Sequence, residues 1–370
     1  MFIWFTRFTS SRANVFAALL ATAGLLVAED ARTPTAPKAA AAKAATPKPS
    51  AKADAKNAKA EPAAPKVGIK TPGVQIPITR LKAEAEIPGA PTWTLASDTL
   101  LVPAASGEAL EKIDLKANKR GEPIPGFSKP CAGAVTAFKS VWVANCGNGT
   151  VVRMEPKTGK IEATLNVGAA SARTGVAATS DSVWVFSDEK TTLSRIDPES
   201  NSVIGEVRLP SGCNQMLFGE TSLWVTCPTE DKLLRINPST NLVEQRITVA
   251  GKPSSVAVGE GSVWVLGLKD GKIDRIDPKT NKVIKTISLE VAGAETGSIA
   301  FGEGALWATL TGFPLTRIDT TAEKEAVVQQ FWGEGGGMIF TASGSVWLSN
   351  TKQATLWRLD PKRVIATLAE

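Results

Sequence analysis

Histidine and tyrosine are absent from this chain of 370 residues. Without histidine there is no Ser-His-Asp or Cys-His triad, no histidine metal cage and no histidine general base. No Cys-x-x-Cys pair occurs, which excludes covalent haem attachment and the common zinc motifs. The glycine-rich stretch Gly333-Glu-Gly-Gly-Gly337 precedes no expected helix, so it is not a phosphate-binding loop. We expect no metal and no cofactor.

Long hydrophobic runs are also missing. The longest, Val15 to Ala28, has 14 residues and is too short for a comfortable membrane span. Arg7 and Arg12 both precede this run, so residues 1–28 are typical of a secretory signal peptide. Cleavage after Ala28 is expected, with an uncleaved anchor as the alternative. The chain is therefore predicted to be periplasmic or secreted.

Large apolar side chains are scarce in residues 29–72, which are rich in alanine, proline and lysine. Such a segment cannot bury enough surface to fold, so we expect a disordered linker. The net charge of +6 divides into +2 for the signal, +5 for the linker and −1 for residues 73–370. The remainder has no basic field that would attract specific nucleic acid. The linker could make weak contacts with cell-wall polymer or a membrane surface.

Tryptophan recurs with a regular period in residues 73–370. The gaps between successive tryptophans are 42, 40, 40, 43 and 40 residues at Trp142, Trp184, Trp224, Trp264, Trp307 and Trp347. A basic residue opens an Arg-Ile-Asp-Pro-like motif 10 or 11 residues after each of them, as at Arg195 and Arg275. A period near 41 residues indicates one supersecondary unit copied along the chain. An eroded seventh copy places Leu101 at the tryptophan position and Lys112 at the arginine position.

Each copy contains four strand-like runs separated by turn residues. In the fifth copy the runs are 254–258, 262–266, 272–276 and 282–289, and Asp277-Pro-Lys-Thr-Asn281 has the residues of a tight turn. No sustained helical period occurs. The chain is therefore predicted to be all-β, a seven-bladed β-propeller of four-stranded antiparallel blades spanning 73–370. Either 364–368 or 80–87 could complete the last blade, or the N-terminal segment could add an outer strand.

The repeated residues are interpreted as scaffold. A tryptophan in every blade suits blade-to-blade packing better than sugar binding, and a repeated arginine suits bonds to a neighbouring blade or strand. The cysteines support the register, because one begins a first strand and the other ends a second strand in each of two blades. We predict the disulfides Cys131–Cys146 and Cys213–Cys227, which fit an oxidising compartment. A zinc site shared between the two blades is the alternative.

The pattern Gly-x-Gly-Ser-Val-Trp-Val followed by Arg-Ile-Asp-Pro-x-Thr-Asn-Lys-Val at 259–283 resembles exported YVTN-type and virginiamycin B lyase-like seven-bladed propellers. The resemblance covers residues 85–370 and rests on scaffold positions. The lyases of that group depend on catalytic histidines and magnesium. No residue here can match those histidines, so the resemblance implies the fold without the lyase activity.

Candidate ligand-binding residues lie where first strands begin and where the loops between second and third strands emerge. The rim offers Ser254, Thr296 and Met338. The residues predicted to bind a ligand are Arg173, Asn214, Gln215, Glu295, Glu334, Asp188 and Asp270. Arg173 stands out because the other copies place uncharged residues there. No residue is predicted to be catalytic.

The leading hypothesis is a monomeric, non-catalytic exported propeller that binds a protein partner or small ligand at the channel mouth. A lyase or hydrolase using carboxylates such as Glu295 and Glu334 with a divalent metal is one alternative. A structural cell-envelope protein is the other.

Overall fold

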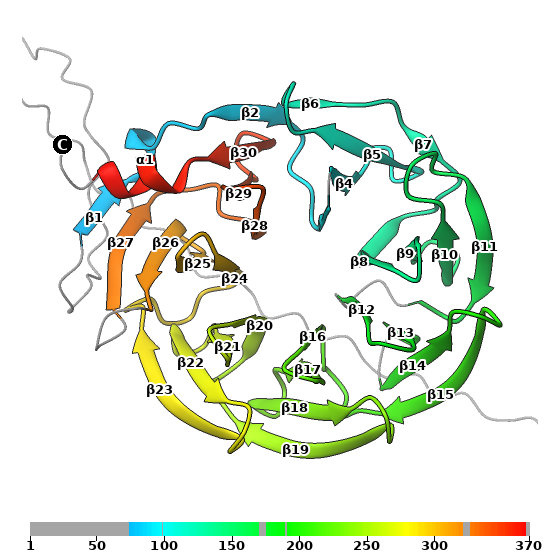
Figure 1. The fold of residues 1–370 in the computed structure, drawn as a ribbon. Helices are drawn as coiled ribbons and strands as arrows, with labels where there is room; N and C mark the ends of the chain where they lie inside the picture. The colour runs from blue at the N-terminus through cyan, green and yellow to red at the C-terminus, as the bar shows by residue number, and fades with distance from the viewer. Residues whose placement is uncertain (1–73, 98, 170–174, 189–190, 321–325, 368–370) are drawn as a thin grey trace, which may run out of the picture. The chain divides into compact units, whose positions relative to one another are not determined.

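The computed structural model describes residues 74–97, 99–169, 175–188, 191–320 and 326–367, all within one compact unit, Glu61–Glu370. The predicted signal peptide (1–28) and linker (29–72) lie outside the described residues. Seven β-sheets stand around a central axis (Figure 1), and each is a blade numbered in the order of its first strand. The seven-bladed propeller expected from the repeat is therefore confirmed.

The strands of the first four blades follow one another along the chain. Blade 1 contains β3 (Leu95–Ala96), β4 (Leu100–Pro103), β5 (Ala109–Asp114) and β6 (Lys119–Arg120), and β7 (Ile124–Pro125) also pairs with β5. Blade 2 contains β8 (Pro130–Ala137), β9 (Ser140–Asn145), β10 (Thr150–Met154) and β11 (Ile161–Asn166). Blade 3 contains β12 (Val176–Ala178), β13 (Val183–Phe186), β14 (Thr192–Asp197) and β15 (Ser202–Arg208). Blade 4 contains β16 (Gln215–Gly219), β17 (Ser222–Cys227), β18 (Lys232–Asn237) and β19 (Leu242–Thr248).

The last three blades include two strands from the start of the described chain. Blade 5 contains β20 (Pro253–Gly259), β21 (Ser262–Gly267), β22 (Lys272–Asp277) and β23 (Lys282–Ser288). Blade 6 contains β24 (Gly297–Gly302), β25 (Ala305–Leu310), β26 (Phe313–Asp319) and β27 (Ala326–Trp332), with β1 (Val74–Pro77) added in parallel outside β27. Blade 7 contains β28 (Ile339–Ala342), β29 (Ser345–Asn350), β30 (Thr355–Leu359) and β2 (Ala85–Pro88).

Ring closure is made by β2, which pairs antiparallel with β30 and places Ile87 opposite Leu356. The other candidate, residues 364–368, does not supply the strand. Pro361–Ala366 instead forms the short helix α1, whose N-cap Asp360 accepts a hydrogen bond from the Lys362 backbone N–H. A capping aspartate followed by proline favours a helix start over a strand. Two of the alternatives left open by the sequence occur together, because β1 adds an outer strand to blade 6 while β2 completes blade 7. A 3₁₀ turn, η1 (Ile78–Arg80), separates them.

The turns confirm the local reading of the repeat. In blade 5 the Asp277 carboxylate accepts hydrogen bonds from the Lys279 N–H at 2.9 Å and the Thr280 hydroxyl at 2.7 Å. Asn281 closes that turn with φ of 59°, a conformation that asparagine tolerates. Between the first two strands Glu260 and Gly261 both have positive φ, at 51° and 63°, which suits the right-handed twist of a two-residue hairpin.

The apolar core lies between the blades. Seven hydrophobic clusters of described residues each join two neighbouring blades, and one of them packs Ile87, Trp347 and Leu356 against blade 1. The ring is thereby closed by the same kind of interface that joins all other blades. The six repeated tryptophans are fully buried, with 0% exposure. Burying about 150–250 Å² each, at about 25 cal/mol/Å², they make a large share of this packing energy.

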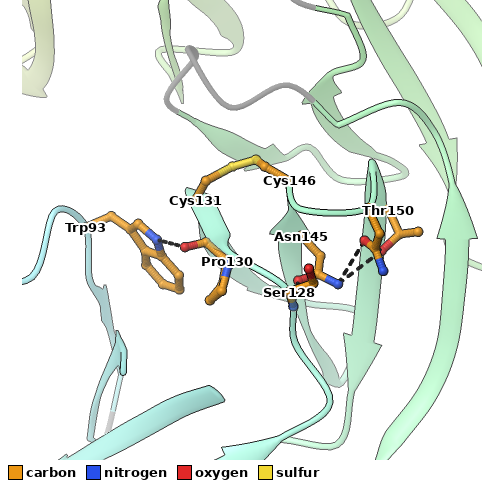
Figure 2. The surroundings of a disulfide bond; sticks show 8 residues. Trp93, Ser128, Pro130, Cys131, Asn145, Cys146 and Thr150 are labelled. Atoms are coloured by element: carbon orange, nitrogen blue, oxygen red, sulfur yellow. Dashed lines mark hydrogen bonds between the residues drawn. A yellow bond between two sulfur atoms is a disulfide. The ribbon is translucent and has the colours of Figure 1, made fainter. Parts of the chain in front are cut away.

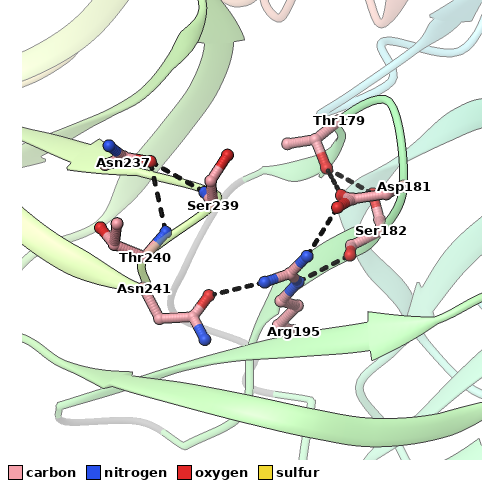
Figure 3. Close-up of polar contacts among 8 residues, drawn as sticks. All are labelled: Thr179, Asp181, Ser182, Arg195, Asn237, Ser239, Thr240 and Asn241. Atoms are coloured by element: carbon pink, nitrogen blue, oxygen red, sulfur yellow. Dashed lines mark hydrogen bonds and ion pairs between the residues drawn. The ribbon is translucent and has the colours of Figure 1, made fainter.

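The repeated arginines clamp one blade to the next, as Figure 3 shows for blades 3 and 4. Arg195 lies over the Trp184 ring, donates to Ser182 Oγ at 2.7 Å, and reaches Asn241 Oδ1 of the next blade at 3.1 Å. Asp181 accepts a further bond from Arg195 at 2.7 Å. The expected structural role of these arginines is confirmed.

An arginine of the same kind joins the last blade to the first. Arg358 of blade 7 donates to Leu115 O at 2.7 Å and to Asn118 Oδ1 at 3.1 Å in blade 1. Arg317 departs from the pattern: Ala305 stands at the serine position, and Arg317 donates to Gln329 Oε1 at 2.8 Å instead.

Candidate functional site

A central cavity of about 690 Å³ runs along the first strands of the blades. In Figure 1 these strands face the open centre of the ring, among them β8, β16 and β24. Residues 92–94, just before β3, complete the wall on the side of blade 1. Among the described residues that line this channel none carries a formal charge. Its polar groups are hydroxyls, amides and backbone from residues such as Thr92, Asn214, Gln215, Ser254, Thr296 and Ser298.

Two of the predicted site residues, Asn214 and Gln215, line the channel. Gln215 Oε1 accepts a hydrogen bond from the Val256 N–H of the next blade at 2.7 Å. Asn214 Oδ1 accepts one from the Thr226 hydroxyl at 2.9 Å. Their oxygens are therefore held in place by the scaffold, which fixes the direction in which each amide faces.

A hydrogen bond of the same kind joins the first strands of blades 5 and 6. The Ile299 N–H donates to Ser255 Oγ at 3.0 Å, so side chains of one first strand satisfy backbone donors of the next. This arrangement makes the channel wall rigid, because each inner strand is tied to its neighbour through a side chain as well as through packing. At the mouth, the Thr296 and Thr311 hydroxyls lie 3.3 Å apart and are exposed.

The predicted aspartates lie outside the channel lining and accept hydrogen bonds from loop backbone. Asp188 Oδ1 accepts from the N–H groups of Thr191 and Thr192, at 2.6 and 2.8 Å. Asp270 Oδ2 accepts from the Gly251 N–H at 2.7 Å. Both carboxylates therefore shape loops. Short acidic side chains in loops commonly serve their own backbone in this way.

The predicted glutamates are not brought together in the channel. Glu295 is exposed, and its backbone N–H donates to Thr311 Oγ1 at 3.2 Å. Glu334 is also exposed and forms an ion pair with Lys352. The hydrogen bond and charge of Lys352 hold the pKa of Glu334 below its ordinary value. Arg173 lies outside the described residues, two positions before Gly175, which lines the channel.

Some channel residues were not anticipated. Trp93 occupies the position eight residues before Leu101, where the next blades have Ala134 and Val176. The other blades all have an aliphatic residue or methionine at this position, so a tryptophan there is a break in the repeat, and that break was the available signal. Figure 2 shows its indole N–H donating to Pro130 O at 3.1 Å, which ties the wall of blade 1 to the start of blade 2.

The cysteines form the two disulfides expected from the register, Cys131–Cys146 and Cys213–Cys227. Figure 2 places the first beside Asn145, whose Oδ1 accepts a hydrogen bond from the Ser128 N–H at 2.6 Å. Each bond clips a first strand to the second strand of its own blade near the channel. No cluster of three His, Cys, Asp or Glu side chains that could hold a metal occurs within the described ranges. Within those ranges no helix has the length and apolar character needed to cross a membrane.

Comparison with known proteins finds the fold in solved structures. Virginiamycin B lyase from Staphylococcus aureus is 17% identical, with a TM-score of 0.61 over 74% of this chain and 97% of the lyase. A streptogramin B lyase is 16% identical, with a TM-score of 0.59 over 73% of this chain and 93% of the lyase. A chain in the mitotic checkpoint complex is 11% identical, with a TM-score of 0.63 over 85% of this chain and 99% of its own.

A scan of protein-family models and a search of curated proteins both find no match. At these identities the likeness concerns the fold. The chain therefore has the seven-bladed fold that occurs both in virginiamycin B lyase and in a component of a protein assembly.

Proposed function

We propose that this protein is an exported, non-catalytic binding module whose protein partner or small ligand docks at the mouth of the central channel. The observation that carries the proposal is the uncharged, hydroxyl- and amide-bearing lining of a cavity of about 690 Å³. Sites of this size usually bind through apolar walls and a few fixed polar groups. The amides of Asn214 and Gln215 and the hydroxyl of Ser298 would supply directional hydrogen bonds.

Export remains part of the proposal. The apolar, arginine-flanked residues 1–28 support it, and so do two disulfides in a chain with no other cysteine. Disulfides persist mainly in oxidising compartments. The alanine-, proline- and lysine-rich residues 29–72 would then act as a spacer between the propeller and the cell envelope.

Catalysis is the alternative suggested by the lyase fold neighbours. It would need carboxylates to act as acid, base or metal ligands. Glu295 and Glu334 are the candidates, but Glu334 already pairs with Lys352 and neither residue lines the channel. Binding is therefore favoured.

Site-directed photo-crosslinking tests the proposal. A benzoylphenylalanine placed at Thr296, which is exposed at the mouth, should give a specific protein or small-molecule adduct in the source cells. The matched control carries the probe at Ile284, which is 54% exposed on outer strand β23. Equal labelling at both positions would contradict the proposal. Turnover of lactone, glycan or peptide substrates that Glu295→Gln abolishes would instead support the enzyme.

A further inference from the structure

A second cavity, of about 410 Å³, lies between blades 6 and 7 and is separate from the residues that line the channel. Its walls come from the end of β27, the end of β29 and the loop after it, the middle of β30, and the end of β1 with the residues that follow it. Ile78, next to the end of β1, forms part of one wall. The N-terminal strand added to blade 6 therefore helps to build this cavity, which we call the blade 6–7 pocket.

Two tryptophans that break the repeat meet in this pocket. Trp332 and Trp357 both line it. The position of Trp332 is occupied in blade 5 by Ser288 and the position of Trp357 by Asp274, according to the strand registers. Aromatic rings thus replace small or polar side chains at two positions of the same pocket. Trp357 belongs to the buried core between blades 6 and 7, whereas Trp332 is half-buried and packs against the core between blades 5 and 6. Trp332 is therefore the ring that is open to the pocket.

One of the rings is held in a fixed orientation. The Trp357 indole N–H donates to Gln353 Oε1 at 3.1 Å. The same oxygen accepts from Asn350 Nδ2 at 3.1 Å, and Asn350 Oδ1 in turn accepts from the Gln353 N–H at 3.1 Å. Trp357 is 6% exposed and Asn350 is 4% exposed. Trp357 therefore forms a fixed part of the pocket wall, which loses little freedom when a ligand binds.

The charges of the pocket balance. Glu334 and Lys352 both line it, and they pair with each other. A ligand with a net charge of either sign would have to compete with that pair. A quaternary ammonium ligand, which aromatic rings can also bind, would in addition meet the Lys352 ammonium. The pocket therefore favours a neutral ligand that carries both hydrogen-bonding groups and an apolar face.

The volume limits the size of the ligand. At about 30 Å³ for each water in the liquid, 410 Å³ corresponds to roughly 14 waters. That space suits a ring compound of about a dozen non-hydrogen atoms.

We infer that the blade 6–7 pocket binds one neutral sugar ring. The C–H face of a pyranose would lie against the half-buried ring of Trp332, and its hydroxyls would bond to Glu334, Lys352 and the side-chain amide of Gln353. Tryptophan suits this role because it offers a broad apolar face at little entropic cost.

Saturation-transfer NMR and calorimetry on residues 29–370 test the inference, with methyl β-D-glucopyranoside and N-acetylglucosamine as probes. Saturable binding of at least one sugar is expected. Trp332→Ala should weaken it by about tenfold or more, and Trp332→Phe by less. Glu334→Gln and Lys352→Met change exposed side chains, so they test the polar contacts in a chain that keeps its fold, and each should weaken binding.

A matched channel variant separates this pocket from the proposed functional site. Ser298→Ala removes a hydroxyl from the channel lining and should leave sugar binding unchanged. Three outcomes would overturn the inference: no saturable binding of either sugar, unchanged binding in Trp332→Ala, Glu334→Gln and Lys352→Met alike, or saturation of the pocket by tetramethylammonium while sugars fail. Loss of sugar binding in Ser298→Ala would assign the sugar to the channel and would also overturn it.

Discussion

Single residues in this propeller divide into those that repeat and those that break the repeat. The repeated arginines find their hydrogen-bond partners within the scaffold. Arg235, for example, lies over Trp224, donates to Ser222 Oγ at 2.8 Å, and reaches Pro278 O of the next blade at 2.6 Å. A side chain with that many partners has few donors left for a ligand. The residues that break the repeat, such as Trp93 and Trp332, gather at cavities instead.

Truncating one repeated tryptophan should therefore cost stability and leave the proposed sites intact. Trp264 is fully buried, and its indole N–H donates to Gly259 O at 3.2 Å. We expect Trp264→Ala to lower the free energy of unfolding by about 3–5 kcal/mol, measured by urea denaturation. The control Ile284→Ala, on an exposed side chain, should change it by about 0.5 kcal/mol or less. A small effect at Trp264 would mean that the blade interface does not depend on this ring.

The turn carboxylates give a second residue-scale prediction. Hydrogen bonds from the Thr158 hydroxyl, at 2.6 Å, and from the backbone of Lys157 and Thr158 lower the pKa of Glu155 to about 2. Thr158→Val removes the hydroxyl donor, so the pKa of Glu155 should rise toward its ordinary value. An NMR titration of the carboxyl carbon measures this. Thr280→Val, which changes the equivalent hydroxyl at Asp277, should not move Glu155. Equal pKa values in the wild type and Thr158→Val would show that the hydroxyl contributes nothing.

At the scale of strands, closure of the ring of blades depends on the four residues of β2, which lie far in sequence from the rest of blade 7. Strand β2 supplies the outer strand of blade 7, and Ile87 is fully buried at the interface with blade 1. Burial of one such side chain is worth about 1.5–3 kcal/mol. Strand β2 also forms backbone hydrogen bonds with the outer edge of β30, and no other described strand pairs with that edge.

Deletion of residues 1–88 should therefore lower the urea midpoint of unfolding relative to deletion of residues 1–72. The shorter deletion keeps both β1 and β2 and removes only the predicted signal and linker, so it should match residues 29–370. Circular dichroism follows both transitions. Identical midpoints for the two deletions would show that β1 and β2 do not stabilise the ring.

The elements also show how far the sequence could be interpreted. The strands of blade 5, its turns and both cysteine pairs follow from local patterns, because the strand and turn signals recur in register along the chain and the cysteines take matching positions in two blades. The strand that closes the ring could not be chosen from the sequence, because Val364-Ile-Ala-Thr-Leu368 and Arg80–Ile87 both have strand-like composition. Only the three-dimensional ring shows that β2 already occupies the edge of β30.

For the candidate site, the sequence indicated where the rim residues lie but not which partners their side chains have. Counting back from each tryptophan located the rim, and Asn214 and Gln215 do line the channel. The sequence could not show that the oxygens of Asp188 and Asp270 are taken by backbone N–H groups, because a loop carboxylate looks the same whether its partner is a ligand or its own chain. That Trp332 and Trp357 line one pocket was equally hidden, since they lie in different blades.

For the molecule as a whole, the lack of histidine determines how stability depends on pH. No side chain of ordinary pKa then titrates between about pH 5 and 8. The turn carboxylates Asp114, Glu155, Asp197 and Asp277 all have pKa values below their ordinary ones, because donors of their own turns bond to them. A carboxyl whose pKa is lower in the folded state stabilises the fold above its unfolded pKa. That contribution is lost as the pH falls through the folded value.

The free energy of unfolding should therefore be nearly constant from pH 8 to 5. It should then decline between about pH 4.5 and 2, the interval that separates the ordinary pKa of glutamate from that of Glu155. Urea titrations at a series of pH values and fixed ionic strength measure the profile. Repetition across the blades makes the decline cumulative, since an equivalent acidic turn occurs in several of them. A step in stability between pH 6 and 7 would contradict this account, because it would require a titrating group that the turns do not contain.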